Sequence, residues 1–227
     1  MILESAAVGP FFKNGFVVGC ERTREAVFID PGDEVEQLLS FIAAEQLKVT
    51  HILLTHAHVD HVSGVAEAKR VLAAPIYLHH DDLFIYQNAV RTGMMFGLTV
   101  EEPPPVDHFY EPPFDIAHAK PITFGDYEVR VLHTPGHCPG GVCLALSKKG
   151  DAGAPRLFVG DTLFAGSIGR TDLPGGNYDT LLKAITGVLF AFPDESIVHS
   201  GHGPETTIGR ERTTNPFVLE YLATNPR

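Results

Sequence analysis

Four potential metal ligands lie within six consecutive positions of the chain: His56, His58, Asp60 and His61. His56 and His58 are two positions apart, so in an extended segment their side chains point the same way, and a following turn brings the other two to a neighbouring point. Imidazole and carboxylate groups are good ligands for first-row divalent ions. Gathering them in a poorly hydrated pocket without an ion would cost free energy. This stretch therefore predicts a metal site.

Three later residues extend this set of candidates. His137, Asp161 and His202 each follow an apolar stretch, and a glycine lies beside each of them. Glycine leaves room for close backbone approach at a site. Taken alone, His137 or His202 is more often a structural or surface imidazole than a ligand. Taken together with the first cluster, they favour a metal site built from four short loops.

One arrangement uses all seven candidates, with three ligands on each of two ions and one bridge: His56, His58 and His137 on the first, Asp60, His61 and His202 on the second, and Asp161 between them. Neither ion is then saturated. Each keeps a position for a shared hydroxide, as a catalytic site requires and a closed structural site does not.

The other histidines lack such spacing and are expected to be structural or exposed: His51, His79, His80, His108, His118, His133 and His199. His133 and His199 lie close in sequence to candidate ligands, so a role as hydrogen-bond partners of those ligands is a minority alternative. Cys138 directly follows His137. It is interpreted as a small buried residue beside the site, with a soft ligand or redox-sensitive thiol as the less favoured alternative.

The composition limits the classes of protein and partner. With 227 residues, 44% of them hydrophobic, and an even composition, the chain is expected to form a single domain over residues 1–227. A net charge of −11 argues against a nucleic-acid partner, since such binding normally shows as a basic stripe. The N-terminus resembles no signal peptide, and no stretch reaches the roughly 20 apolar residues of a membrane span. Three cysteines without paired spacing suit a cytoplasmic protein.

The first half of the chain predicts an α/β layer. Short strands around 3–8, 15–20 and 26–29 suggest an antiparallel meander, and a buried strand at 51–54 delivers His56 and His58. A helix with buried Val35, Leu38, Leu39 and Ile42 lies between them, and Asp33 with Glu36 resembles a capping box. A second helix is expected from near His61, with Val65, Ala68 and Leu72 buried, before a strand at 75–78. Ligands then lie beyond the carboxyl end of a strand.

The second half begins after a less regular segment. Residues 79–115 contain a candidate helix at 82–90, an irregular stretch at 93–97 and a run of three prolines at 103–105, and they form either a lid or substrate wall or a surface excursion. A hairpin is predicted at 122–124 and 128–132, with strands at 142–146, 157–159 and 196–199. A helix burying apolar residues between Leu181 and Leu189 follows a glycine-rich loop at 165–176.

These residues resemble the metallo-β-lactamase superfamily, whose signature is His56-Ala-His58-Val-Asp60-His61 followed in order by His137, Asp161 and His202. The resemblance spans nearly the whole chain. It implies an α/β fold, a four-layer αβ/βα sandwich with the metal site at one edge of two sheets. Three strings look like the hydroxyacylglutathione hydrolases, or type II glyoxalases: Thr134-Pro-Gly-His137, Gly160–Phe164 and Gly169-Arg170. Two longer strings, Gly166–Asp172 and Gly201–Thr206, are similar to the short single-domain bacterial branch of that group.

This resemblance implies a metal-dependent hydrolase that cleaves a small-molecule thioester such as an S-2-hydroxyacylglutathione. Two divalent ions are expected, with zinc as the first choice and iron or manganese as alternatives. Their bridging water is deprotonated near neutral pH and attacks the thioester carbonyl. Asp60 is expected to orient that nucleophile while ligating the second ion. Arg170 is a candidate for binding a substrate carboxylate, with an ion pair to Asp172 as the equal alternative, and Tyr178 is a weaker candidate for the pocket wall.

Two departures leave alternatives open. Full-length type II glyoxalases carry a C-terminal helical extension that supplies much of the glutathione site, whereas only about 25 residues follow His202 here. The string Gly169-Arg170-Thr171-Asp172 is also shared with glutathione persulfide dioxygenases, which use one iron. Oxidation of glutathione persulfide is therefore the rival reaction, and lactone hydrolysis on the same scaffold is a third. Nuclease activity is disfavoured by the acidic charge, and a purely structural metal site is disfavoured by the unsaturated ions.

Overall fold

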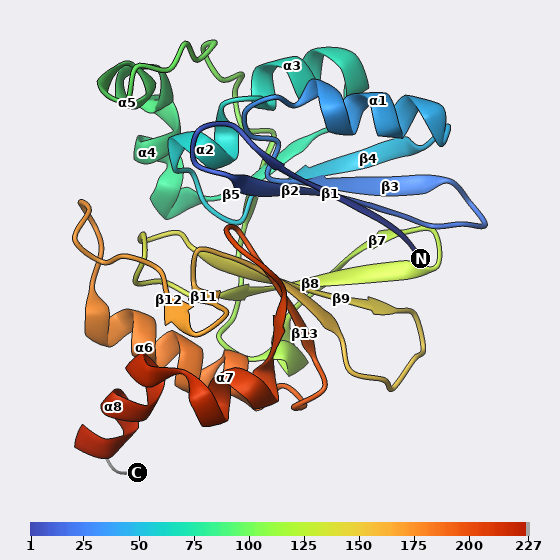
Figure 1. Cartoon of the computed structure of the whole chain (residues 1–227). Helices are drawn as coiled ribbons and strands as arrows, with labels where there is room; N and C mark the ends of the chain where they lie inside the picture. The colour runs from blue at the N-terminus through green and yellow to red at the C-terminus, as the bar shows by residue number, and fades with distance from the viewer. Residues whose placement is uncertain (226–227) are drawn as a thin grey trace. The chain divides into compact units, whose positions relative to one another are not determined.

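The computed structural model describes residues 1–225 of the chain. Contacts divide the chain into two compact units, one of Met1–Glu111 with Thr123–Tyr127 and one of Pro112–Ile122 with Glu128–Arg227. Each unit has its own sheet, its own helices and its own buried apolar cluster (Figure 1). The single domain expected over residues 1–227 stays a prediction.

The first unit is built on a six-stranded sheet in the order β1-β2-β3-β4-β5-β6. Its strands are β1 (Ile2–Val8), β2 (Lys13–Gly19), β3 (Glu25–Ile29), β4 (Lys48–Leu53), β5 (Ile76–His79) and β6 (His108–Tyr110). The first three pair antiparallel, which confirms the predicted meander, and β3 to β6 pair parallel. Because β3 and β4 run parallel, the residues that follow them, Asp30 and Thr55, meet at one edge of the sheet.

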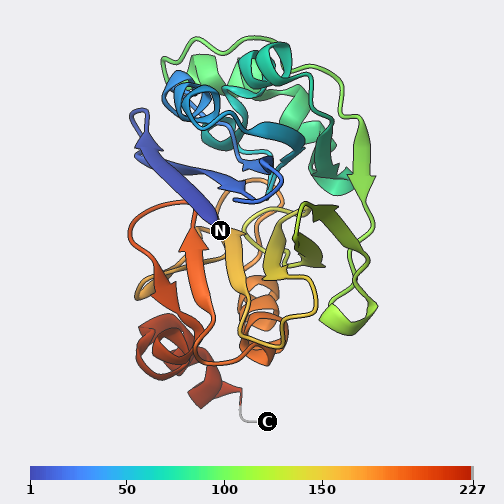
Figure 2. The ribbon, with the colours of Figure 1, turned by 90° about the vertical axis from the view of Figure 1, so that its right-hand side faces the viewer.

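Helices cover one face of this sheet. Figures 1 and 2 show α1 (Glu36–Ala44) and α3 (Val65–Leu72) side by side along it. The short helix α2 (Val59–Val62) carries two candidate ligands, and α4 (Leu83–Gln87) and α5 (Ala89–Met95) follow β5 after a 3-10 turn, η1 (His80–Asp82). The buried residues of α1 are Leu38 and Ile42, as the helical spacing predicted.

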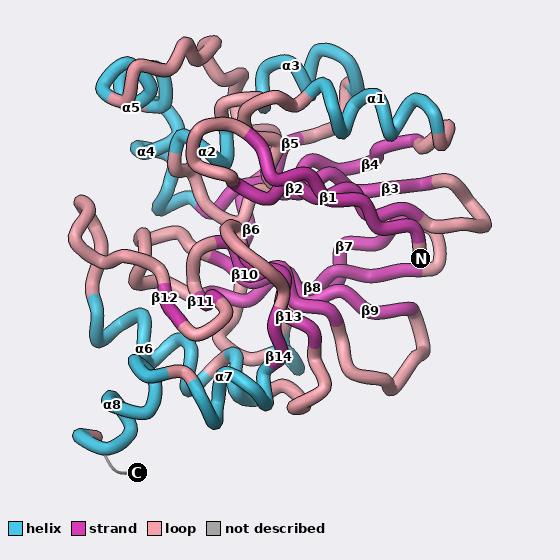
Figure 3. The backbone as a smooth tube through the Cα atoms, viewed as in Figure 1, coloured by secondary structure: helices cyan, strands magenta, loops and turns pink. Residues whose placement is uncertain are grey.

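The second unit is organised by a sheet in the order β14-β13-β10-β9-β8-β7 (Figure 3). Its strands are β7 (Pro121–Phe124), β8 (Tyr127–His133), β9 (Val142–Lys148), β10 (Arg156–Gly160), β13 (Ile197–Ser200) and β14 (Thr206–Thr207). Strands β10 and β13 are parallel neighbours, so the segments that follow them, with Asp161 and His202, leave the same edge. A small hairpin, β11 (Leu163–Phe164) with β12 (Ser167–Ile168), comes directly after Asp161.

The helices of this unit are α6 (Tyr178–Gly187), α7 (Ile208–Thr214) and α8 (Pro216–Thr224), with 3-10 turns η2 (Ile116–His118) and η3 (Leu189–Ala191). Figures 1 and 2 place the three α-helices on one face of the second sheet. Leu181, Leu182 and Ile185 of α6 are fully buried in the second cluster, in agreement with the spacing of apolar residues.

Several local predictions were wrong in detail. Helix α1 begins at Glu36 with Val35 as its N-cap, and Asp33 accepts a hydrogen bond from the amide of Glu34 instead of forming a capping box. The helix expected to start near His61 is split into α2 and α3. Helix α5 extends to Met95, into a stretch expected to be irregular, and α6 ends before Val188.

Gly64, at the split between α2 and α3, packs closely against the loop after β3. A Cβ on Gly64 would lie 2.1 Å from the carbonyl oxygen of Gly32 and 2.7 Å from Cβ of Val35. The amide of Gly64 in turn donates to the carbonyl of Pro31, at 3.0 Å. The loop after β3 and the ligand-bearing segment therefore pack backbone to backbone at this glycine.

Among residues 1–225, no helix has the length and apolar character required to cross a membrane.

We predict that Gly64→Ala lowers the free energy of unfolding by about 2 kcal/mol or more, because an added methyl group must displace backbone atoms. Gly187→Ala, at the end of α6, is the matched control, since nothing lies within 4 Å of its added Cβ. That change should be neutral or stabilising by up to about 1 kcal/mol. Urea unfolding measures both, and equal stability of the two variants would contradict the close approach at Gly64.

Candidate metal centre

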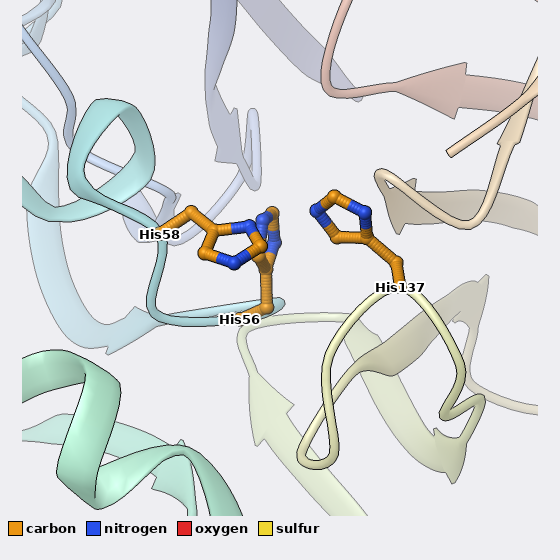
Figure 4. Close-up of side chains that lie close together, drawn as sticks. All are labelled: His56, His58 and His137. Carbon is orange, nitrogen blue, oxygen red and sulfur yellow. The ribbon is translucent and has the colours of Figure 1, made fainter. Parts of the chain in front are cut away.

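The first unit gathers His56, His58, Asp60 and His61, which we call the first half-site. The ring centroids of His56 and His61 are 4.0 Å apart, and those of His56 and His58 are 4.9 Å apart. Nε2 of His61 lies 3.7 Å from Oδ2 of Asp60. Figure 4 shows His56 and His58 with adjacent rings on the loop that follows β4. His56 and His61 are buried, so these polar groups are largely removed from water.

Asp30, which was not among the candidate residues of the sequence, organises the first half-site. Its carboxylate is 1% exposed and accepts hydrogen bonds from the amide of Thr55 at 2.7 Å, from the Thr55 hydroxyl at 2.6 Å and from Nδ1 of His61 at 2.9 Å. Because a carboxylate can only accept, the proton of His61 is held on Nδ1. Nε2, the nitrogen directed towards Asp60, is then the nitrogen available to a metal ion, as in many histidine sites with a carboxylate partner.

Two further buried charged side chains support the same loops. Asp82 is fully buried and accepts from the amide of Ala57, at 3.0 Å, in the middle of the segment that carries His56 and His58. Lys13 is 1% exposed and its ammonium donates to the carbonyl of Asp30. Neither was expected from the sequence. Both connect segments far apart in the chain, and local patterns carry no signal of such contacts.

The second unit gathers His137, Asp161 and His202, the second half-site. Oδ2 of Asp161 lies 3.7 Å from Nε2 of His137 and 3.4 Å from Nε2 of His202. His137 is on the loop that follows β8, as Figure 4 shows. Asp161 and His202 follow the parallel strands β10 and β13. Each half-site thus lies beyond the carboxyl ends of neighbouring parallel strands, and the second also draws His137 from a third loop.

The carbonyl of Arg170 fixes the ring of His137. Nδ1 of His137 donates to this oxygen at 2.8 Å, which leaves Nε2 as the nitrogen directed to Asp161. The approach depends on Gly169, because a Cβ there would lie 1.8 Å from the carbonyl oxygen of Asp161 and 3.1 Å from Nδ1 of His137. The backbone of the Gly169-Arg170 dipeptide therefore packs directly against the second half-site.

The donor sets fit a divalent metal ion. The separations within the half-sites, 3.4 to 3.7 Å, are too long for good hydrogen bonds. They match the distance of about 3.4 Å expected between two ligand atoms that each lie about 2.1 Å from one tetrahedral zinc ion. Imidazole nitrogens with carboxylate oxygens are also the ligands of zinc, iron and manganese sites.

The two minority candidates, His133 and His199, differ in what they contact. Nε2 of His133 donates to the carbonyl of Pro139 at 2.9 Å, so His133 braces the loop that carries His137. His199 instead accepts from the guanidinium of Arg156 at 3.0 Å and stacks on Phe158. Burial, with the Arg156 charge, lowers the pKa of His199 to about 4.

Three other residues singled out in the sequence are placed as follows. Cys138 is completely buried, and all three cysteines are free thiols. The Arg170 guanidinium forms a bidentate pair with Asp172, at 2.7 and 2.8 Å, which is the ion-pair alternative. This pair raises the pKa of Arg170 and lowers that of Asp172 to about 2. Tyr178 is the first residue of α6 and 39% exposed.

The profile of the metallo-beta-lactamase superfamily matches residues 8–202, which contain all seven candidate ligands. The chain belongs to the metallo-beta-lactamase superfamily. A hydroxyacylglutathione hydrolase of Haemophilus influenzae, GloC, is 35% identical over 96% of this chain and 98% of its own length. Among solved structures, the B3 metallo-beta-lactamase BLEG-1 matches with a TM-score of 0.83 and 36% identity, over 96% of this chain and 99% of its own. TTHA1623 in a di-iron-bound form matches with a TM-score of 0.79 and 39% identity, over 94% and 99%.

These matches confirm the expected α/β fold class, the metallo-β-lactamase fold. They also confirm the metallo-β-lactamase superfamily that the sequence resembles. The family match and the hydrolase relative place the chain among the metallo-hydrolases. TTHA1623 is a similar protein that binds two iron ions.

We predict that Asp30→Asn weakens metal binding about 10- to 100-fold, because His61 loses the carboxylate that fixes its tautomer. Competition with a chromophoric zinc chelator measures the dissociation constant. Asp151→Asn, in an exposed turn where the side chain only accepts from the amide of Gly153, is the control. Equal affinities of the two variants would contradict the role assigned to Asp30.

We also predict a pH-dependent stability from His199. Its folded-state pKa lies near 4, below the unfolded value of about 6.5, so its contribution is complete above pH 6.5 and is lost as the pH falls towards 4. Between pH 7 and 4.5 the wild-type chain should lose about 2 to 3 kcal/mol more than His199→Gln. Urea unfolding with a chelator present at both pH values measures this, and identical losses would show that His199 does not titrate as the structure implies.

Proposed function

We propose that this protein is a metal-dependent hydrolase that cleaves a thioester such as an S-2-hydroxyacylglutathione. The observation that carries the proposal is the similarity to GloC over nearly the full length of both chains. The two half-sites, each with imidazoles and a carboxylate at ligand-like separations, supply the required donors. We further propose that the protein works in the cytoplasm, which suits its free cysteines.

In this proposal the two half-sites form one dinuclear centre. The ligands are assigned as the sequence predicted: His56, His58 and His137 on the first ion, Asp60, His61 and His202 on the second, and Asp161 as the bridge. Zinc is the first candidate, and iron is supported by the di-iron relative. Two such ions supply a Lewis acid for the carbonyl and a strong nucleophile from water near neutral pH.

The chain's own residues position the reactants. Asp30 keeps the proton of His61 on Nδ1, and the Arg170 carbonyl does the same for His137, so both rings present Nε2. Asp60 is proposed as the catalytic residue that orients the attacking water. A thiol leaving group has a pKa of about 8.5, so it departs as a thiolate without a general acid. This agrees with the candidate site residues of the sequence, which include no additional general acid.

The substrate-binding roles of Arg170 and Tyr178 remain part of the proposal. Arg170 is already paired with Asp172, so a substrate carboxylate would have to compete with that exposed pair. A guanidinium binds any carboxylate in the same bidentate geometry, so a substrate carboxylate could replace that of Asp172. Tyr178 lies at the start of α6, where Asn177 caps the helix by accepting from the amide of Thr180.

We predict that the purified protein carries two divalent ions per chain and cleaves an S-2-hydroxyacylglutathione, with release of thiol. Chelation should abolish cleavage and metal should restore it. Asp60→Asn should lower kcat/KM on the order of 10²- to 10⁴-fold, because the water is no longer oriented. Metal analysis and a thiol-detecting assay measure these outcomes.

The same preparation should be assayed with a glutathione persulfide under an oxygen electrode, with an acyl homoserine lactone and with a β-lactam. One iron per chain, with oxygen uptake and no thioester cleavage, would show that the protein is a persulfide dioxygenase instead. Opening of a lactone or β-lactam ring without thioester cleavage would keep the hydrolytic chemistry but overturn the proposed substrate.

A further inference from the structure

A buried carboxylate outside the matched family region ties together the loops of the second half-site. Glu211, in α7, is fully buried, although an ionised carboxylate is costly to remove from water unless it is paired or hydrogen-bonded. The superfamily profile ends at residue 202, so α7 and α8 lie beyond it. None of the sequence patterns singled out Glu211.

Three donors from three segments satisfy this carboxylate. Oε2 accepts from the amide of Gly166 at 2.8 Å and from the side-chain amide of Asn215 at 2.8 Å, and Oε1 accepts from the Thr206 hydroxyl at 2.6 Å. Hydrogen bonds to an ionised acceptor are roughly twice as strong as neutral ones. The network is therefore strong enough to fix the geometry of the segments that it joins.

Asn215 extends the network to the hairpin β11–β12. It is fully buried and also donates to the carbonyl of Ser167 at 3.0 Å, while its oxygen caps α8 by accepting from the amide of Phe217 at 3.2 Å. The side-chain NH2 group of Asn215 thus binds Glu211 and the hairpin, and its side-chain oxygen binds the N-terminus of α8. Glu211 and Asn215, four residues apart, hold both the turn and the return strand of this hairpin.

The joined segments are the ones that carry the second half-site. The hairpin begins directly after Asp161, and the strand that returns from it leads into Arg170, whose carbonyl accepts from Nδ1 of His137. Thr206 follows His202 by four residues and pairs with Val198 on β13. One carboxylate therefore contacts the hairpin turn at Gly166, which lies between Asp161 and Arg170, and the strand residue Thr206, which follows His202. The strands and helices involved are labelled in Figure 3.

We propose that Glu211 is a positioning residue for the metal centre, and that the α7–α8 segment is an integral part of the second half-site. This inference rests on the proposed metal centre. Glu211 touches neither substrate nor metal in this account. It positions Asp161 and His202 through hydrogen bonds to the segments that follow them, and it acts on His137 through the hairpin that leads into Arg170.

The test is the affinity for zinc of the full chain carrying Glu211→Gln. Glutamine keeps the shape but replaces one acceptor oxygen by a donor, so it cannot accept from all three donors. We expect the zinc dissociation constant to rise about 10-fold. Thr206→Val removes only one of the three bonds and should give a smaller rise. Glu195→Gln, at an exposed site, is the matched control and should bind as the wild type does.

A second readout separates positioning from a general loss of stability. The ¹⁵N shift of His137 Nδ1 reports its hydrogen bond to the Arg170 carbonyl, and it should move in Glu211→Gln and stay constant in Glu195→Gln. Wild-type affinity and an unmoved shift in Glu211→Gln would overturn the inference. If Glu211→Gln does not fold, Thr206→Val decides by the same two measurements. A wild-type chain that binds no metal would overturn the proposed function instead, and the His137 shift would then decide the inference alone.

Discussion

The structure depends on one constraint, which is that an imidazole buried in protein must have its second ring nitrogen satisfied before the first can ligate a metal ion. His61 meets it through the carboxylate of Asp30, and His137 meets it through the carbonyl of Arg170. Each acceptor is itself fixed, Asp30 by Thr55 and Lys13, and Arg170 by the close approach of Gly169. The burial of the Asp30 and Lys13 charges and the need for glycine at position 169 agree with this requirement.

The same arrangement of parallel strands and the loops that follow them appears in both units. In each, two parallel strands are neighbours, and the residues that follow their carboxyl ends meet at one edge of the sheet. In the first unit these are Asp30 and the segment from Thr55 to His61. In the second they are Asp161 and the segment to His202, which the C-terminal helices join through Glu211. The first unit thus uses a carboxylate to hold a ligand directly, whereas the second uses one to hold the loops.

The clustering of the candidate ligands and most strands could be predicted from the sequence because their signals are local. The run before His56 is apolar, the glycines flank the later candidates, and the helical spacing of α1 and α6 gives their buried faces. Contacts between distant segments carry no such signal. No sequence pattern singled out Asp30 or Glu211, and Asp82 lay in the less regular segment at 79–115. Their roles depend on burial, which the tertiary structure decides.

The capping box and the continuous helix from His61 failed for a related reason. Local propensity favoured both, but the chain packs closely against the loop after β3 at Gly64, and Val35 is the N-cap of α1. Tertiary packing overrode short-range preference at these two positions. The departures at α5 and α6 concern only where each helix ends.

The central proposal is that the seven candidate ligands bind one pair of ions. The most direct test is X-ray absorption spectroscopy of the metal-loaded chain, because two ions in a shared site scatter from one another. The account predicts two ions per chain about 3.5 to 4 Å apart, with histidine-rich coordination. Isolated ions with no metal–metal scattering, or a single ion per chain, would contradict it.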